Sequence, residues 1–458
     1  MTLLQAMRAE LRPLAQIALP LVVLRLGTVT MGFVDGWYAG RLGGDALGTL
    51  SLAIAVYVIA VLFAQGTLAG VEPIASQAVG AGDRQAQRRS LAGVLLAGVA
   101  LLPVFVAVLF AGGWVLERLG QPAHLLEPTR RYLAVVAAGF PAGVVYWACS
   151  SWLTAIGRTR VFVGITLLAA TLNVVLNHAL VTGAWGAPAL GVTGISVATA
   201  CSMWFQCAAL LVLARRELRL GALVCEVDPA AVRRSTGPVL RLGLPLGVQY
   251  GLESGAFSLT TVMVGMTGAL ALAAHQVAMN VIAVTFTISL ALSAAGSARV
   301  GHAVGRRDPD GARVSALTVW AVGLLLAGVG AALMVAFREP YAQWFVDDPP
   351  VAELATVFIL VAAVFQLADV TQAIGFGVLR GFGDTAFPAL FNIAGFWLLG
   401  LPIGAFAVFH RGAHPVWLWI GLSIGLYLVA MGLMLRFVRN LRALRDGRIG
   451  PLGSAGGR

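Results

Sequence analysis

The chain has 458 residues, of which 59% are hydrophobic and 11% charged, and its mean hydropathy is +0.88. Soluble proteins carry about 25% charged residues because their surface meets water, so this composition excludes a soluble fold. The length allows about twelve membrane-spanning helices and little else. The formal net charge of +11 does not indicate nucleic acid as a partner, because all 31 basic residues are arginines in short gaps between apolar runs.

Apolar runs bounded by glycine, proline and charge predict the spanning helices in chain order. The runs are too long for barrel strands and do not alternate, so we expect an all-α membrane protein. The first run continues to Asp35 without a cleavage pattern, and we interpret it as a retained helix. We expect twelve spans, at residues 13–38, 45–72, 90–112, 130–153, 161–182, 189–214, 238–264, 270–296, 314–337, 351–378, 386–409 and 415–437.

The arginines indicate how the spans are oriented. If the N-terminus lies inside, the inner segments hold 24 arginines and the outer segments hold six, while Arg25 lies within the first span. Because basic residues concentrate in cytoplasmic loops, this distribution predicts that both termini are cytoplasmic.

The two halves of the sequence resemble each other at an offset of 225 residues. Pro20 recurs as Pro245, and Asp83 in the first long inner loop recurs as Asp308. Each half holds six spans, so the halves share one orientation and are related by a pseudo-two-fold axis along the membrane normal. Such repeats are typical of transporters with a substrate site between two bundles. We expect two pseudo-symmetric six-helix bundles, at residues 1–220 and 221–458.

We single out four ionisable residues inside the predicted spans as functional candidates. Asp35 is in the first, Glu253 near the middle of the seventh and Asp369 in the tenth, where Gln372 is a polar neighbour; Arg25 is the one basic group. A charge within a span costs about 2.5–3.5 kcal/mol on insertion scales, so each is a candidate functional residue. The net negative interior suits protons, sodium or organic cations. If one carboxylate binds either the coupling ion or the cationic substrate, the two compete for it. Their exchange across the membrane is then antiport.

Other interpretations of single residues stay open. Asp35 could be interfacial, and Glu72, near the end of the second span, is interpreted as interfacial. Further polar pairs stand four residues apart, on one helix face, where they could serve the site or hold helices together. These pairs are Asn173 with Asn177 and Gln276 with Asn280. The four cysteines lack any ligand spacing, and we expect no metal cofactor or other cofactor.

Six sequence stretches in order cover nearly the whole chain and carry a family resemblance. They are GFVDGWYAGRLG, AIGRTRVF, LNVVLNH, GAWGAPALGVTGISVAT, AAHQVAMNV and LRGFGDTAFP. Together with the two six-helix halves, they resemble the multidrug and toxic-compound extrusion (MATE) transporters, in particular the NorM-like branch.

This resemblance implies a V-shaped twelve-helix exporter of the MOP superfamily, not an enzyme, in the bacterial inner membrane. Such a protein would use a Na⁺ or H⁺ gradient to expel small cationic amphipathic drugs or metabolites, contact membrane lipids and act as a monomer. Asp35 then matches the N-terminal cation site, and Glu253 and Asp369 match a C-terminal carboxylate pair that could bind Na⁺. The other implied site residues are Asn173, Asn177, Thr199, Gln276, Asn280 and Phe286.

Other functions fit the residues less well. A lipid-linked oligosaccharide flippase of the same superfamily remains the alternative, but its polyanionic substrate would require several arginines in the spans, and Arg25 is alone there. A membrane enzyme would need a motif such as HExxH or a nucleophile with a histidine partner, and the sequence has none.

Overall fold

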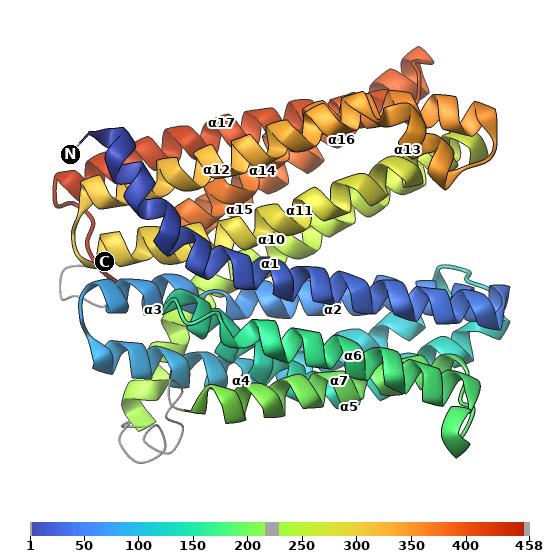
Figure 1. The fold of residues 1–458 in the computed structure, drawn as a ribbon, viewed down its shortest axis with the longest axis horizontal. Coiled ribbons are helices and arrows are strands. Elements are labelled where there is room, and N and C mark those ends of the chain that lie inside the picture. Colours follow the sequence, from blue (N-terminus) through green and yellow to red (C-terminus); the bar gives the residue numbers. More distant parts are fainter. Residues whose placement is uncertain (1, 216–228, 453–458) are drawn as a thin grey trace. The chain divides into compact units, whose positions relative to one another are not determined.

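The computed structural model describes residues 2–215 and 229–452, and all regular structure in these residues is helical (Figure 1). The helices of the first half are α1 (Leu3–Leu42), α2 (Gly44–Leu68), α3 (Val71–Gly80), α4 (Arg84–Arg118), α5 (Ala123–Ala155), α6 (Val161–Thr182), the short 3₁₀ turn η1 (Ala184–Gly186) and α7 (Val192–Leu213). Those of the second half are α10 (Pro229–Met266), α11 (Ala269–Gly305), α12 (Pro309–Ala336), α13 (Arg338–Phe345), α14 (Pro349–Gly381), α15 (Ala386–Ile393), η2 (Ala394–Gly400), α16 (Leu401–Ala405), η3 (Phe406–His410) and α17 (Trp417–Arg445).

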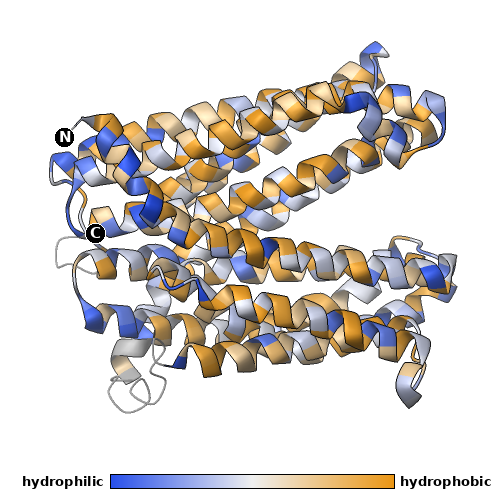
Figure 2. Cartoon of the chain, viewed as in Figure 1, coloured by the Kyte–Doolittle hydropathy of each residue, from blue (hydrophilic) through white to orange (hydrophobic). Residues whose placement is uncertain are grey.

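The all-helical membrane class is confirmed, and a helix lies at each of the predicted spans. Eleven helical runs among the described residues are long and apolar enough to cross a membrane, with α2 continuing into α3 and α15 continuing through η3. The twelfth is α10, which has 38 residues but carries polar groups such as Gln249 and Glu253 in its apolar stretch. Figure 2 shows apolar residues along the middle of the long helices and hydrophilic residues mainly toward their ends.

Packing groups the chain into two compact units. The N-terminal unit comprises Leu19–Val71 and Arg84–Gly247, and the C-terminal unit comprises Met1–Ala18, Glu72–Asp83 and Val248–Arg458. The boundary predicted between residues 220 and 221 lies outside the described residues.

In the C-terminal unit, α17 packs closely against the run from η2 to η3. A Cβ atom added at Gly421 would lie 2.5 Å from the Gly400 carbonyl oxygen, and one at Gly425 would lie 2.3 Å from the Gly395 carbonyl oxygen. Small residues allow this backbone contact. The same run contains two π-helical segments, η2 and η3.

Helix α3 is held in the C-terminal unit by a buried ion pair. Arg380 Nε lies 3.1 Å from Glu72 Oε2, and Arg380 also donates to Ser297 Oγ and to the Tyr250 hydroxyl, each at 3.2 Å. Glu72 is only 5% exposed, so its carboxylate is buried within the protein, which its interpretation as an interfacial residue did not anticipate. A buried carboxylate is tolerated here because a cation neutralises it.

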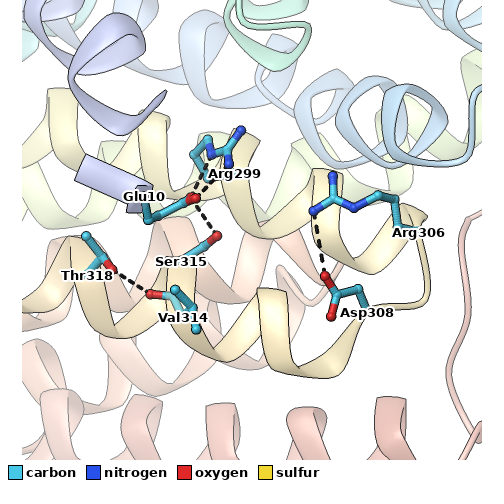
Figure 3. Close-up of polar contacts among 7 residues, drawn as sticks. All are labelled: Glu10, Arg299, Arg306, Asp308, Val314, Ser315 and Thr318. Carbon is cyan, nitrogen blue, oxygen red and sulfur yellow. Dashed lines mark hydrogen bonds and ion pairs between the residues drawn. The ribbon is translucent and has the colours of Figure 1, made fainter. Parts of the chain in front are cut away.

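The start of α1 is attached to the same unit by a second carboxylate. The two Glu10 oxygens accept from Arg299 Nε and Nη2, both at 2.7 Å, and Oε1 also accepts from Ser315 Oγ at 2.7 Å. Figure 3 shows Glu10 between Arg299 of α11 and Ser315 of α12. Such a bidentate pair fixes orientation as well as charge.

Candidate functional site

The carboxylate of Asp35 lies at the centre of a polar cluster in the N-terminal unit. Asp35 Oδ1 accepts from Asn177 Nδ2 at 2.7 Å and from Asn173 Nδ2 at 3.4 Å, and Oδ2 accepts from Thr199 Oγ1 at 3.3 Å. The structure therefore brings these four predicted residues of α1, α6 and α7 together. Tyr132 of α5, which sequence reasoning missed, is buried and interacts with Thr199.

The chemistry of this cluster is that of one acid among neutral polar groups. Asn173 and Asn177 share a helix face because they are four residues apart, and Asn177 Nδ2 also donates to Asn173 Oδ1 at 3.1 Å. Asn177 Oδ1 is buried without a hydrogen bond. No arginine or histidine forms an ion pair with Asp35 among the described residues, so its charge can be balanced by a proton or one small cation.

Glu253 and Asp369 form a second acidic site, in the C-terminal unit. Asp369 of α14 is 1% exposed, and neither of its carboxyl oxygens has a hydrogen-bond partner among the described residues. Glu253 of α10 is partly buried and lies near enough to interact with Asp369 electrostatically. Because no basic residue in the described part of the chain pairs with either carboxylate, this is an acidic site.

Two amide side chains complete the second site. Asn392 Nδ2 donates to Glu253 Oε2 at 2.9 Å, and Gln372 Nε2 donates to Asn392 Oδ1 at 2.5 Å. Sequence reasoning noticed Gln372 only as a polar neighbour of Asp369 and missed Asn392. The available signal was weak: Asn392 is a lone amide in the apolar run FPALFNIAGFW.

The three candidates on α11 are not linked to the carboxylates by hydrogen bonds among the described residues. Gln276 and Asn280 are exposed and Phe286 is partly buried, and within residues 2–215 and 229–452 none hydrogen-bonds Glu253 or Asp369. Nearby His275 is occupied at both ring nitrogens, since Trp419 Nε1 donates to Nδ1 at 2.9 Å and Thr261 Oγ1 lies 3.0 Å from Nε2.

The site chemistry differs from that of a transition-metal centre. In the described part of the chain, no three or more His, Cys, Asp or Glu side chains gather as a metal cluster. The acidic groups instead stand among amide and hydroxyl oxygens, which are ligands of hard cations.

Twelve helical spans, two sequence halves in tandem and carboxylates buried within the spans define a polytopic membrane transporter. A family model described as MatE matches residues 20–178 and 245–406. The chain belongs to this family. The two matched segments start at Pro20 and Pro245, which is the 225-residue offset of the internal repeat.

Relatives and solved structures agree with this family. The chain is 32% identical over 445 residues to "Multidrug resistance protein PmpM" of Pseudomonas aeruginosa, covering 95% of this chain and 92% of that protein. It is 33% identical over 432 residues to "Probable multidrug resistance protein NorM" of Bradyrhizobium diazoefficiens, covering 92% of each. The fold is similar to the Vibrio cholerae MATE transporter VcmN in its bent form, with a TM-score of 0.86, 17% identity and coverage of 96% and 99%. The resemblance to the NorM-like branch is confirmed.

Proposed function

We propose that this protein is a secondary multidrug exporter, which moves small cationic amphipathic compounds out of the cell in exchange for Na⁺ or H⁺. The observation that carries the proposal is the set of carboxylates at Asp35, Glu253 and Asp369, which lie within the spans and form no ion pair with a basic residue among the described residues. Relatives that align with more than 90% of the chain and are named for multidrug resistance support the same reading.

The exchange follows from competition at these carboxylates. A drug cation and a coupling ion cannot both neutralise the same acid, so binding of one releases the other. Alternating access by two repeats then carries them in opposite directions. No cofactor is needed, because the ion gradient supplies the free energy.

The candidate side chains divide into three roles in this proposal. Asn173, Asn177 and Thr199 hold the Asp35 carboxylate, while Glu253 and Asp369 bind the coupling ion, with Na⁺ as a candidate. Gln276, Asn280 and Phe286 have accessible surface on α11, and we assign them to contact with the drug. The ring of Phe286 can attract a cation through its π face.

The proposed orientation follows from the arginines. With 24 of them on one side in the predicted topology, we propose that both termini face the cytoplasm. The bacterial origin of the relatives supports an inner-membrane location, where we propose that the protein works as a monomer among lipids. Reporter fusions to the loops test this: an alkaline phosphatase fusion after Arg118 should be active, and one after Arg84 should be inactive.

Purified protein in liposomes tests the transport proposal. With ethidium as the probe, we expect uphill efflux under an imposed Na⁺ or H⁺ gradient, each applied separately. Asp369→Asn and Glu253→Gln should each reduce this efflux at least tenfold. The exposed Glu339→Gln serves as the matched control and should transport like the wild type. Absence of efflux under both gradients would exclude the exporter proposal.

The same liposomes distinguish the flippase alternative. A polyanionic pyrophosphate lipid needs cationic contacts in the spans, and the sites described above are acidic. Translocation of such a lipid without ethidium efflux would favour the flippase over the exporter.

A further inference from the structure

A chain of two amides ends on the Glu253 carboxylate. Gln372 donates to Asn392, and Asn392 donates to Glu253. Both amide residues are 1% exposed, so neither side chain can exchange its partner for bulk water. Their hydrogen bonds must be satisfied within the protein or by a bound species.

The hydrogen bonds of this chain all run toward Glu253, and this fixes how the amide of Gln372 is oriented. An ionised carboxylate only accepts hydrogen bonds, so Asn392 presents its NH₂ group to Glu253 and its oxygen to Gln372. Gln372 must then present its own NH₂ group to Asn392. Its carbonyl oxygen Oε1 is left over, and the structure gives that buried oxygen no hydrogen-bond partner.

This leftover oxygen lies on the same helix as the unpartnered carboxylate. Gln372 follows Asp369 by three residues on α14, so the two side chains share a helix face. Asp369 Oδ1 and Oδ2 and Gln372 Oε1 are all buried acceptors without donors. Carboxylate and amide oxygens are the ligands that hard cations prefer.

The backbone near Asn392 supports a positioning role. Trp397 Nε1 donates to the Leu252 carbonyl at 3.2 Å, so two side chains five residues apart both contact α10 beside Glu253. In an α-helix, the side chains of residues five positions apart point about 140° away from each other around the helix axis. The π-helical segment η2, from Ala394 to Gly400, pairs i with i+5 and brings them closer to one face.

We propose that Asn392 is a positioning residue for the Glu253 carboxylate and that Gln372 Oε1 is a neutral ligand of Na⁺ bound by Glu253 and Asp369. The proposal rests on the proposed function, since it extends the same cation site. It accounts for the unpartnered oxygens of Asp369 and Gln372 on α14 and for the direction of the amide chain toward Glu253.

Sodium binding to the full-length protein tests the proposal without any drug. Purified protein in detergent is titrated with NaCl by isothermal calorimetry, with choline chloride keeping the ionic strength constant. Gln372→Met removes the amide at nearly constant shape, and we expect at least a tenfold weaker affinity for Na⁺. Asn392→Leu should weaken Na⁺ at least tenfold, and Asn392→Gln, which keeps an amide, should weaken it less.

A matched control separates positioning from general stability. Asn440 Nδ2 donates to Asp384 Oδ2 at 3.0 Å, so Asn440→Leu removes the same kind of contact elsewhere in the unit and should leave Na⁺ affinity unchanged. The melting midpoint in choline shows that each variant is folded. A variant that loses Na⁺ affinity at an unchanged midpoint supports the proposal.

The outcomes distinguish this proposal from the one on which it rests. If Gln372→Met and Asn392→Leu bind Na⁺ like the wild type while Asp369→Asn does not bind, the amide roles are wrong and the cation site stands. If Asp369→Asn also binds like the wild type, the cation site itself is wrong. A wild type without any Na⁺ response would overturn the ligand role of Gln372.

Discussion

The buried ion pair between Glu72 and Arg380 should respond to mutation in a way that an exposed pair does not. Its side chains are 7% and 4% exposed. Removing one partner leaves the other charge in a poorly solvated place, which typically costs about 3–5 kcal/mol. We therefore expect Glu72→Gln and Arg380→Met each to destabilise the protein by about that amount.

The double variant should be more stable than either single variant. It leaves no uncompensated charge, and what remains lost are the two hydrogen bonds from Arg380 to Ser297 and Tyr250. At about 1 kcal/mol each, these predict a double variant roughly 2 kcal/mol below the wild type. The pair thus holds α3 in place without being a large net source of stability.

Thermal unfolding in detergent, followed by tryptophan fluorescence, gives the order of the four melting midpoints. We expect wild type above the double variant and the double variant above both singles. Glu339→Gln, which changes an exposed pair with Arg338, should shift stability by less than about 0.5 kcal/mol. Additive losses in the double variant, or singles that melt with the wild type, would refute the reasoning.

Three further substitutions test other parts of the structure. Asp35→Asn should reduce ethidium efflux in liposomes more than tenfold at an unchanged melting midpoint, because an amide cannot bind the coupling ion; efflux at the wild-type rate would contradict the N-terminal site. Gly421→Ala places a Cβ 2.5 Å from a facing carbonyl oxygen and should destabilise the protein by about 1–3 kcal/mol. The control Gly328→Ala, which has open space around the added Cβ, should be neutral or stabilising. Equal melting midpoints for the two variants would argue against close packing at α17. Glu10→Gln should cost about 1–2 kcal/mol through its weakened pair with Arg299, and a midpoint equal to that of the wild type would show that this contact does not anchor α1.

The helices could be predicted from the sequence because hydropathy is a local property. The span expected at 161–182 has the bounds of α6, and most of the other spans lie within the observed helical runs. The spans expected at 189–214, 314–337 and 415–437 extend one to three residues beyond α7, α12 and α17. The helix ends outside the membrane could not be predicted as well, since a charged extension such as that of α17 is equally typical of a loop.

The Asp35 cluster was predictable in part, because Asn173 and Asn177 show their common face by spacing alone. The amides of the second site were not, because the contact of Asn392 with Glu253 joins residues 139 apart and no periodic pattern marks either. The ion pair of Glu72 was missed for the same reason: its partner Arg380 lies in the other half of the chain, so no local pattern reveals the contact. The π-helical turns of η2 and η3 depend on close glycine packing, which also arises only in the folded protein.

The composition of the C-terminal unit has a consequence for how the protein is made. Its first segments, Met1–Ala18 and Glu72–Asp83, are synthesised before most of the N-terminal unit, and their packing partners begin at Val248. At about 5–20 residues per second, the ribosome needs roughly ten to thirty seconds to synthesise the intervening segment, Arg84–Gly247. During this time Glu10 and Glu72 have no arginine from the second half to pair with. The unit that the chain starts first is therefore the one it completes last, and release of the nascent chain before the last helices would leave both carboxylates without their ion pairs.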